Sequence, residues 1–300
     1  MAEWMLGASH NLAGDQASAQ RSYQSAFNRA ATSGFSEVHS FGYDHQVRAL
    51  IGYARTLWLC GFPDRAVQFS RQAIDVAGRQ RHPVSLCMGL TCAAPVFLWR
   101  GDLGTAEDLI ERLIAHATRY SLALYRACGL GLRGQLILAR GDAQRALELL
   151  HEVLSTMRTA LSNSFLRALA EGLARAGRPA EAMLIIKALV EEAARGPGYE
   201  LPDFLRAQAE VLLADSRDSW QRAEASLISS IDLARQQSAL GWELRSAIAL
   251  ARLWADHERA DEARALLAGI YDRFTEGFGT ADLREAEHQI HVLGCRISRC

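Results

Sequence analysis

Lysine is almost missing from this 300-residue chain. Lys187 is the only lysine among its 33 basic residues, so every other one is an arginine. Because Lys187 does not lie in a G-x-x-x-x-G-K-[ST] loop, the sequence excludes a P-loop NTPase site. The net charge of −1 and the pI of about 6.8 give no bulk attraction to nucleic acid or to a membrane surface. Any basic surface here must consist of guanidinium groups, which pair bidentately with carboxylates.

Paired cysteines and long apolar runs are missing too. None of the six cysteines belongs to a C-x-x-C pair, so we expect no structural zinc. We expect no other cofactor either. Most of them lie in apolar helical stretches, as core cysteines do in a reducing cytoplasm. No uncharged apolar stretch reaches the roughly 18 residues that span a bilayer, and the first residues lack the pattern of a signal peptide. The sequence therefore predicts a cytoplasmic protein that binds no membrane.

Catalytic motifs are poor. We find no G-x-S-x-G turn and no H-E-x-x-H metal motif. The nearest approach to a metal site is Glu287-His288-Gln289-Ile290-His291, where the spacing is more typical of the solvated face of a terminal helix. We therefore predict that the chain is not an enzyme.

What the sequence does contain is a repeat. A tight-turn residue followed five positions later by alanine occurs at Gly14, Gly61, Gly101, Gly141 and Gly177, and again at Asp218 and Glu258. The starts are 47, 40, 40, 36, 41 and 40 residues apart. Twelve positions before each alanine stands Gly7, Ala54, Ala94, Gly134, Ala170, Val211 or Ala251. Small residues on two successive helices, joined by a Gly-Asp turn, form the pattern of tetratricopeptide (TPR) repeats, here with a period longer than the usual ~34 residues.

The predicted fold is an all-α, right-handed solenoid of about seven TPR-like helix hairpins that ends in a capping helix. We expect one superhelical domain over residues 1–300. The repeats are predicted near residues 1–33, 45–80, 84–120, 125–160, 162–196, 202–237 and 242–274, and the capping helix over 282–293. Asp282 and Glu285, three residues apart, suggest a capping box at the start of that helix.

The first helix of each TPR hairpin lines the concave side of the array, at positions −6, −3, +1 and +4 from the small residue. In the sixth repeat this register selects Leu205, Gln208, Leu212 and Asp215. Among all such positions, the candidate ligand-binding residues are Arg48, Arg55, Trp58, Gln135, Arg167, Glu171, Gln208, Arg245 and Arg252. Five of these are arginines, which suits a protein or peptide partner that carries carboxylates. Several could instead bridge neighbouring repeats.

Parts of the chain resemble a known family. The segments 242–254, 262–278 and 281–286, and less specifically 54–66 and 82–86, are similar to the C-terminal TPR region of large bacterial signal-transduction proteins. In those proteins a winged-helix or adenylate-cyclase-type module precedes an AAA/NB-ARC ATPase and the TPR array. The resemblance implies a regulatory or sensor region of a transcriptional regulator. No ATPase or winged-helix motif is visible here, so neither activity is carried over.

Two alternatives stay open. The connection Gly34–His45 is rich in aromatic and histidine residues, so an enzyme with its site near the His39–His45 loop is a second hypothesis. The first hairpin also has no capping unit of its own, although solenoids normally need one. That end could mediate self-association as a homodimer.

Overall fold

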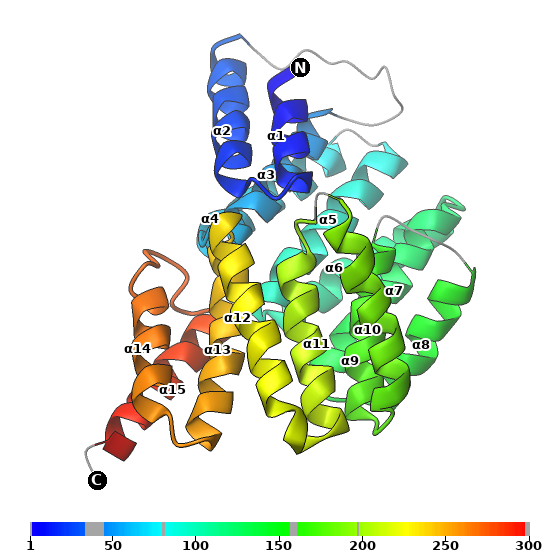
Figure 1. Cartoon of the computed structure of the whole chain (residues 1–300). Coiled ribbons are helices and arrows are strands. Elements are labelled where there is room, and N and C mark those ends of the chain that lie inside the picture. The colour runs from blue at the N-terminus through cyan, green and yellow to red at the C-terminus, as the bar shows by residue number, and fades with distance from the viewer. Residues whose placement is uncertain (1, 34–44, 80–81, 157–160, 197, 298–300) are drawn as a thin grey trace.

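The computed structural model describes residues 2–33, 45–79, 82–156, 161–196 and 198–297. This part of the chain is almost entirely helical and contains no strand (Figure 1). The helices are α1 (Ala2–Leu12), α2 (Gln16–Ser33), α3 (His45–Leu59), α4 (Pro63–Arg79), α5 (Pro83–Arg100), α6 (Leu103–Arg119), α7 (Ala123–Ala139), α8 (Ala143–Thr156), α9 (Ser162–Arg175), α10 (Pro179–Ala194), α11 (Leu201–Asp215), η1 (Arg217–Ser219), α12 (Trp220–Gln236), α13 (Leu240–Asp256), α14 (Ala260–Tyr271) and α15 (Ala281–Ile297). They form seven consecutive antiparallel hairpins, and α15 covers the last one. The predicted fold class is confirmed.

The repeated turn works as its composition predicts. All five turn glycines adopt left-handed backbone conformations, with φ between +76° and +95°, which end one helix without a Cβ penalty. The following aspartate then caps the next helix in three hairpins, where Asp15, Asp102 and Asp142 accept a hydrogen bond from the backbone N–H three residues on. In the seventh turn Glu258 adopts φ +62° in place of a glycine. The sixth turn is different and contains the short helix η1.

Small residues let the two helices of each hairpin approach closely. The seven alanines of the frame, Ala19, Ala66, Ala106, Ala146, Ala182, Ala223 and Ala263, are all completely buried. The residues twelve positions earlier, on the first helix of each hairpin, are buried as well. One of them is Gly134, where an added Cβ would lie 2.8 Å from Leu150 Cγ. Larger side chains there would force the helices apart, because a packed core has little room for added methylenes.

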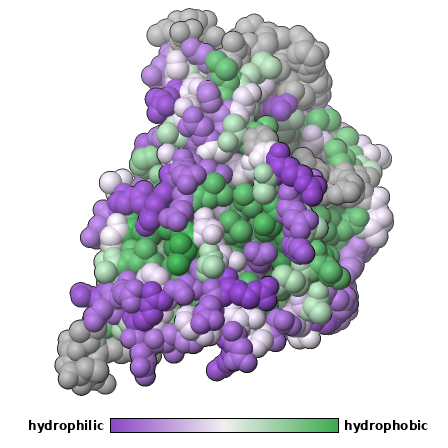
Figure 2. Space-filling view, in the orientation of Figure 1, coloured by the Kyte–Doolittle hydropathy of each residue, from purple (hydrophilic) through white to green (hydrophobic). Residues whose placement is uncertain are grey.

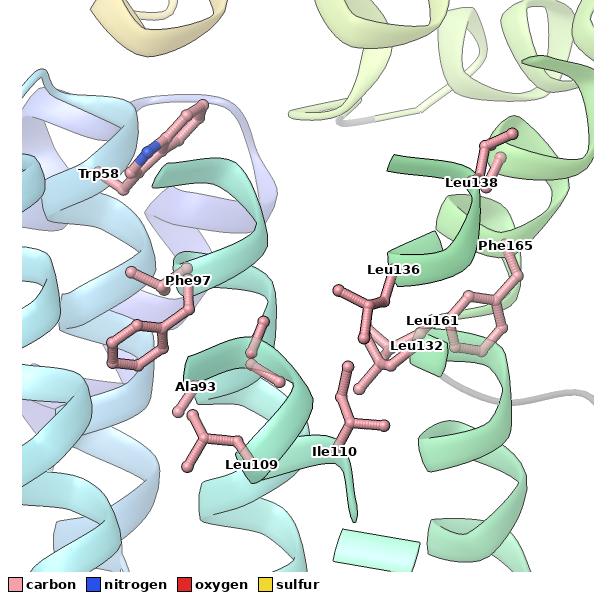
Figure 3. Packing of buried hydrophobic residues seen from close by; sticks show 14 of the residues in the cluster. Trp58, Ala93, Phe97, Leu109, Ile110, Leu132, Leu136, Leu138, Leu161 and Phe165 are labelled. Atoms are coloured by element: carbon pink, nitrogen blue, oxygen red, sulfur yellow. The ribbon is translucent and has the colours of Figure 1, made fainter. Parts of the chain in front are cut away.

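Clusters of buried apolar residues run along the array. Residues that connect successive hairpins, such as Ile110, Leu132 and Phe165, are fully buried in a single cluster that reaches from Trp4 to Trp242. Figure 3 shows Ile110 directed toward Leu132 and Leu136 across the boundary between two hairpins. A second cluster holds the last two hairpins and α15 together. Each hairpin therefore buries its apolar faces against its neighbours, as a solenoid requires.

The most apolar helix is α5. It is long and apolar enough to cross a membrane, but more than half of it is buried inside the array, and it packs against α3, α4, α6 and α7. The composition of α5 is therefore explained by its place in the core.

Figure 2 shows polar and apolar side chains mixed on the face that carries α10 to α14.

The start of α15 differs from the predicted capping box. Thr280 is the capping residue, since its hydroxyl accepts a hydrogen bond from Leu283 N at 3.3 Å. Asp282 lies inside the helix and pairs with Arg245 instead. A tertiary contact, which the local spacing cannot encode, decides the role of this carboxylate.

Candidate functional site

The superhelix closes on itself, so that its first and last repeats touch. The start of α13 contacts the end of α3, although almost 200 residues separate the two helices in sequence. The turn glycines of the first three hairpins all lie in this contact. A Cβ added at Gly14 would lie 3.0 Å from Gln237 Nε2. A Cβ added at Gly61 would lie 2.6 Å from Leu240, and one added at Gly101 would lie 2.5 Å from Ala281. At Gly141 and Gly177 it would meet nothing within 4 Å. We call the contact of these first three turns with residues 237–282 the seam.

A polar clasp reinforces the seam on its outer side. Glu276, in the α14–α15 loop, accepts hydrogen bonds at 3.0 Å from the backbone N–H groups of Asp64 and Arg65, and also pairs with the Arg65 side chain. In return, Asp64 accepts a hydrogen bond from Gly277 N at 2.9 Å. The residue before α4 is Phe62, which has no capping oxygen. Glu276 therefore caps α4 from the other end of the chain.

Three tryptophans meet on the inner side of the seam. Trp58 of α3, Trp99 of α5 and Trp242 of α13 have ring centroids 4.8, 4.9 and 5.5 Å apart. The Arg245 guanidinium lies over the rings of Trp58 and Trp242, at 4.7 and 5.5 Å, and donates to the Trp99 carbonyl oxygen at 2.6 Å. This arginine thus joins elements from both ends of the chain, and stacking on indole faces suits a guanidinium.

The concave face is partly filled by the protein's own side chains. Arg55 of α3 donates a 2.8 Å hydrogen bond to the hydroxyl of Tyr199, which lies just before α11, and its guanidinium also faces the Trp99 ring. Burial raises the pKa of Tyr199 to about 12, so the phenol stays neutral. Burial likewise raises the pKa of the neighbouring Glu200. The Arg55–Tyr199 hydrogen bond thus crosses the space enclosed by the concave face, from α3 to the start of α11.

Beyond that bridge a cavity of about 310 Å³ remains, at the lower end of the size of small-ligand sites. Its walls come from α5, α7, α9, α11, α13 and α15, and combine apolar side chains with several charged ones. The lining residues are Leu98, Trp99, Gln135, Leu138, Ala139, Arg167, Ala168, Glu171, Arg175, Arg206, Glu210, Arg245, Ile248, Ala249, Arg252, Asp282 and Glu285.

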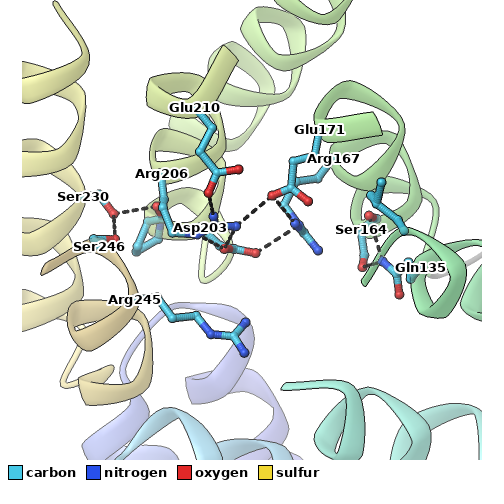
Figure 4. Close-up of polar contacts among 12 residues, drawn as sticks. Gln135, Ser164, Arg167, Glu171, Asp203, Arg206, Glu210, Ser230, Arg245 and Ser246 are labelled. Atoms are coloured by element: carbon cyan, nitrogen blue, oxygen red, sulfur yellow. Dashed lines mark hydrogen bonds and ion pairs between the residues drawn. The ribbon is translucent and has the colours of Figure 1, made fainter. Parts of the chain in front are cut away.

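An ionic network covers the wall formed by α9 and α11 (Figure 4). Arg167 contacts Glu171 at 2.6 Å and Asp203 at 3.0 Å. Arg206 contacts Asp203 and Glu171, each at 2.8 Å, and also Glu210. The side chains of Arg167, Arg206, Glu171 and Asp203 are between 6% and 14% exposed. Two buried arginines therefore hold three carboxylates in fixed positions.

The arginines decide the charge state of these acids. Burial by itself would raise the pKa of Asp203, but Arg167 and Arg206 outweigh it and hold that pKa below its usual value. The same balance lowers the pKa of Glu171. For Glu210, burial outweighs Arg206 and the pKa is raised. Asp203 and Glu171 are therefore firmly ionised near neutral pH, and Glu210 is the acid most easily protonated.

On the opposite wall, arginines of α13 hold the terminal helix. Arg245 pairs with Asp282 at 2.8 Å and Arg252 with Glu285 at 2.8 Å. Arg252 is 59% exposed, at the mouth of the cavity. Arg175 of α9 donates to the Leu138 carbonyl oxygen at 3.3 Å and forms no ion pair with another described residue. Guanidinium groups therefore face the cavity from two walls.

The structure brings five of the nine predicted ligand-binding residues together around the cavity: Gln135, Arg167, Glu171, Arg245 and Arg252. Arg55 and Trp58 lie in the filled part of the concave face. Arg48 is exposed, with its guanidinium over the Trp4 ring at 5.6 Å. Gln208 faces α12, where it accepts a hydrogen bond from Ser226 at 3.2 Å.

The position of Gln208 reflects a shift of register in the sixth repeat. The three-residue helix η1 lengthens the connection between α11 and α12. The small residue of α11 therefore lies two positions before Val211, at Ala209, and both residues are fully buried. Positions −6, −3 and +1 from Ala209 are Asp203, Arg206 and Glu210, which are three of the five residues of the ionic network. Sequence reasoning missed all three, although the run Ser216-Arg217-Asp218-Ser219, which replaces a Gly-Asp turn, was a signal for the longer turn.

The acidic residues that line the cavity, Glu171, Glu210, Asp282 and Glu285, each pair with an arginine. Among the described residues, no group of three or more His, Cys, Asp or Glu side chains could hold a metal ion. The His39–His45 loop, where an alternative enzyme site was predicted, lies outside the described residues except for the backbone of His45 at the start of α3.

Comparison with known proteins supports the fold. No protein-family model matches the chain, and no curated protein sequence matches it. Among solved structures, the Rap conjugation gene regulator of the plasmid pLS20 in complex with the Phr* peptide superposes with a TM-score of 0.70 and 13% identity, over 93% of this chain and 76% of that one. A Rap protein complexed with competence and sporulation factor gives 0.65 and 13%, over 97% and 75%. NprR in complex with its cognate peptide NprX gives 0.56 and 12%, over 97% and 82%. The chain thus has the fold of TPR-like repeat proteins.

Proposed function

We propose that the chain is a non-catalytic TPR-like scaffold that binds a peptide or protein segment on its concave face. The observation that carries this proposal is the cavity of about 310 Å³, in which apolar side chains stand beside guanidinium groups from two walls. A site of this kind orients a ligand through a few charged contacts and gains affinity by burying apolar surface. The peptide complexes of the superposed Rap and NprR structures support the same ligand class.

The partner we propose carries a carboxylate. Arg175 forms no ion pair among the described residues, and Arg252 is more than half exposed beside Glu285. A ligand carboxylate could pair bidentately with either of them. We propose that an acidic side chain or the free end of a peptide anchors in this cavity.

The wider setting is also a proposal. The resemblance to large bacterial signal-transduction proteins suggests that residues 1–300 act as one regulatory unit of a cytoplasmic transcriptional regulator. No direct contact with nucleic acid or membrane is part of this proposal. Self-association through α1 is a second proposal, since Met5, Leu6 and Leu12 are each more than half exposed.

Selection from a random peptide library with free C-terminal carboxylates tests the binding function. Selected peptides, labelled at the N-terminus, should bind with measurable fluorescence polarisation. Arg175→Met and Arg252→Met should weaken binding by about tenfold or more, the usual effect of losing a charged hydrogen bond. Arg178→Met serves as the control, because Arg178 pairs with Glu181 outside the cavity. A library without binders, or peptides that bind all three variants equally well, would contradict the proposal.

A further inference from the structure

We propose that the seam is a gate, and that an extended peptide reaches the whole concave face only when the seam opens. This inference rests on the proposed peptide binding. In the closed ring the Arg55–Tyr199 bridge and the tryptophans fill one part of the channel, and about 310 Å³ stays free. An extended chain advances roughly 3.3 Å per residue, so a longer peptide needs more of the inner wall than its end alone. In this proposal the closed state takes up the end of the peptide in the cavity, and the open state takes up the rest.

The seam is built from contacts that can separate as a unit. Successive hairpins bury continuous helix faces against each other, whereas the seam joins turns and helix ends around the buried Trp58 and Trp242. Its clasp of Asp64, Arg65 and Glu276 is partly exposed, with side chains 50%, 42% and 20% accessible. Exposed ion pairs of this kind contribute little to stability. Opening requires only a small rotation at each repeat boundary, because the curvature of a solenoid is the sum of such rotations.

Arg245 couples the cavity to the seam. Its guanidinium lines the cavity, and it also stacks on Trp58 and Trp242 and donates to Trp99. Asp282 is its acidic partner at 2.8 Å. A ligand carboxylate in the cavity would compete with Asp282 for this arginine, and would thereby loosen the contact between α13, α15 and the first repeats. Ligand binding and ring opening then favour each other, since a ligand stabilises the state to which it binds more tightly.

The turn glycines provide a matched test. Gly101→Ala places a Cβ 2.5 Å from Ala281, across the seam, whereas Gly141→Ala places one in open space. Both glycines have positive φ, +80° and +95°, so the local backbone strain is similar and only the seam differs. Glu276→Gln is a second variant, which weakens the clasp without adding volume. Circular dichroism verifies that all three variants stay helical.

The readout is the association rate of a fluorescein-labelled pool of pentapeptides with free carboxylates, measured by stopped flow. Gly101→Ala and Glu276→Gln should bind faster than Gly141→Ala, by about tenfold if the open population rises tenfold. Hydrogen exchange at residues 273–283 should speed up in the same two variants. Binding at equal rates in all three variants overturns the gate and leaves the proposed function intact. No binding by wild type or by any variant overturns both.

Discussion

Removal of the Arg206 guanidinium tests the ionic network most directly. Its side chain is 12% exposed and contacts Asp203 and Glu171 at 2.8 Å, together with Glu210. In Arg206→Met the aliphatic part of the side chain keeps a similar volume, but three carboxylates are left with Arg167 as their only buried cation. The variant therefore isolates the electrostatic contribution from the packing.

The expected loss is large. Breaking a buried ion pair by removing one partner costs about 3–5 kcal/mol, because the remaining charge stays desolvated. Glu210 is 37% exposed and can regain some hydration, so we expect a value near the lower limit, about 3 kcal/mol. Domains have only about 5–15 kcal/mol of net stability. Such a loss should shift the unfolding midpoint clearly.

The loss should also depend on pH. In the wild type the pKa values of Asp203 and Glu171 lie below their ordinary values of 3.8 and 4.5. Their contribution to stability is therefore present above about pH 4.5 and disappears as the pH falls through the lowered pKa values. Without Arg206 these acids bind protons more readily in the folded state. The gap in stability between wild type and variant should be widest near pH 7 and should narrow toward pH 4.

Urea unfolding followed by circular dichroism at pH 7 and pH 4.5 measures both effects. Arg178→Met is the control, since the Arg178–Glu181 pair is exposed on the surface of α10 and its loss should leave the midpoint unchanged. If Arg206→Met and Arg178→Met unfold at the same urea concentration at pH 7, the network does not stabilise the array and our reasoning on its electrostatics is wrong.

Two further predictions concern Glu200 and the N-terminal helix. Burial raises the pKa of Glu200, so the ionised side chain destabilises the fold progressively as the pH rises above 4.5. Glu200→Gln should therefore raise the thermal unfolding midpoint at pH 8 and have little effect at pH 4. An unchanged or lower midpoint at pH 8 would contradict this. Self-association through α1 predicts a dimer in light scattering that Leu12→Asp, at a residue 55% exposed, converts to a monomer. A monomeric wild type at high concentration would exclude that interface.

The repeat frame by itself determined the hairpins. Alanine and glycine at fixed spacing specify which helix faces can approach closely, and Gly-Asp specifies where one helix ends and the next begins. Both effects act over a few residues, so they are legible in the sequence. The same local counting identified Gln135, Arg167, Glu171, Arg245 and Arg252 as inner-face residues.

Local counting failed where a turn changed length. The extra helix η1 moved the inner face of α11 by two residues, so that Arg206 in place of Gln208 faces the cavity. Nor could spacing show which charges pair. Arg167, Arg245 and Arg252 were predicted to await a partner, and the structure gives each of them an acid from another part of the chain or from its own helix.

The closure of the ring was decided by the tertiary structure alone. It arises from small rotations that accumulate over seven hairpins, and no single repeat encodes their sum. Only after closure do Gly101 and Ala281, or Glu276 and the start of α4, become neighbours. The sequence determined the repeating unit because that unit is stabilised by near neighbours. The shape of the concave face depended on the whole array, because its opposite walls come from residues that are far apart in the chain.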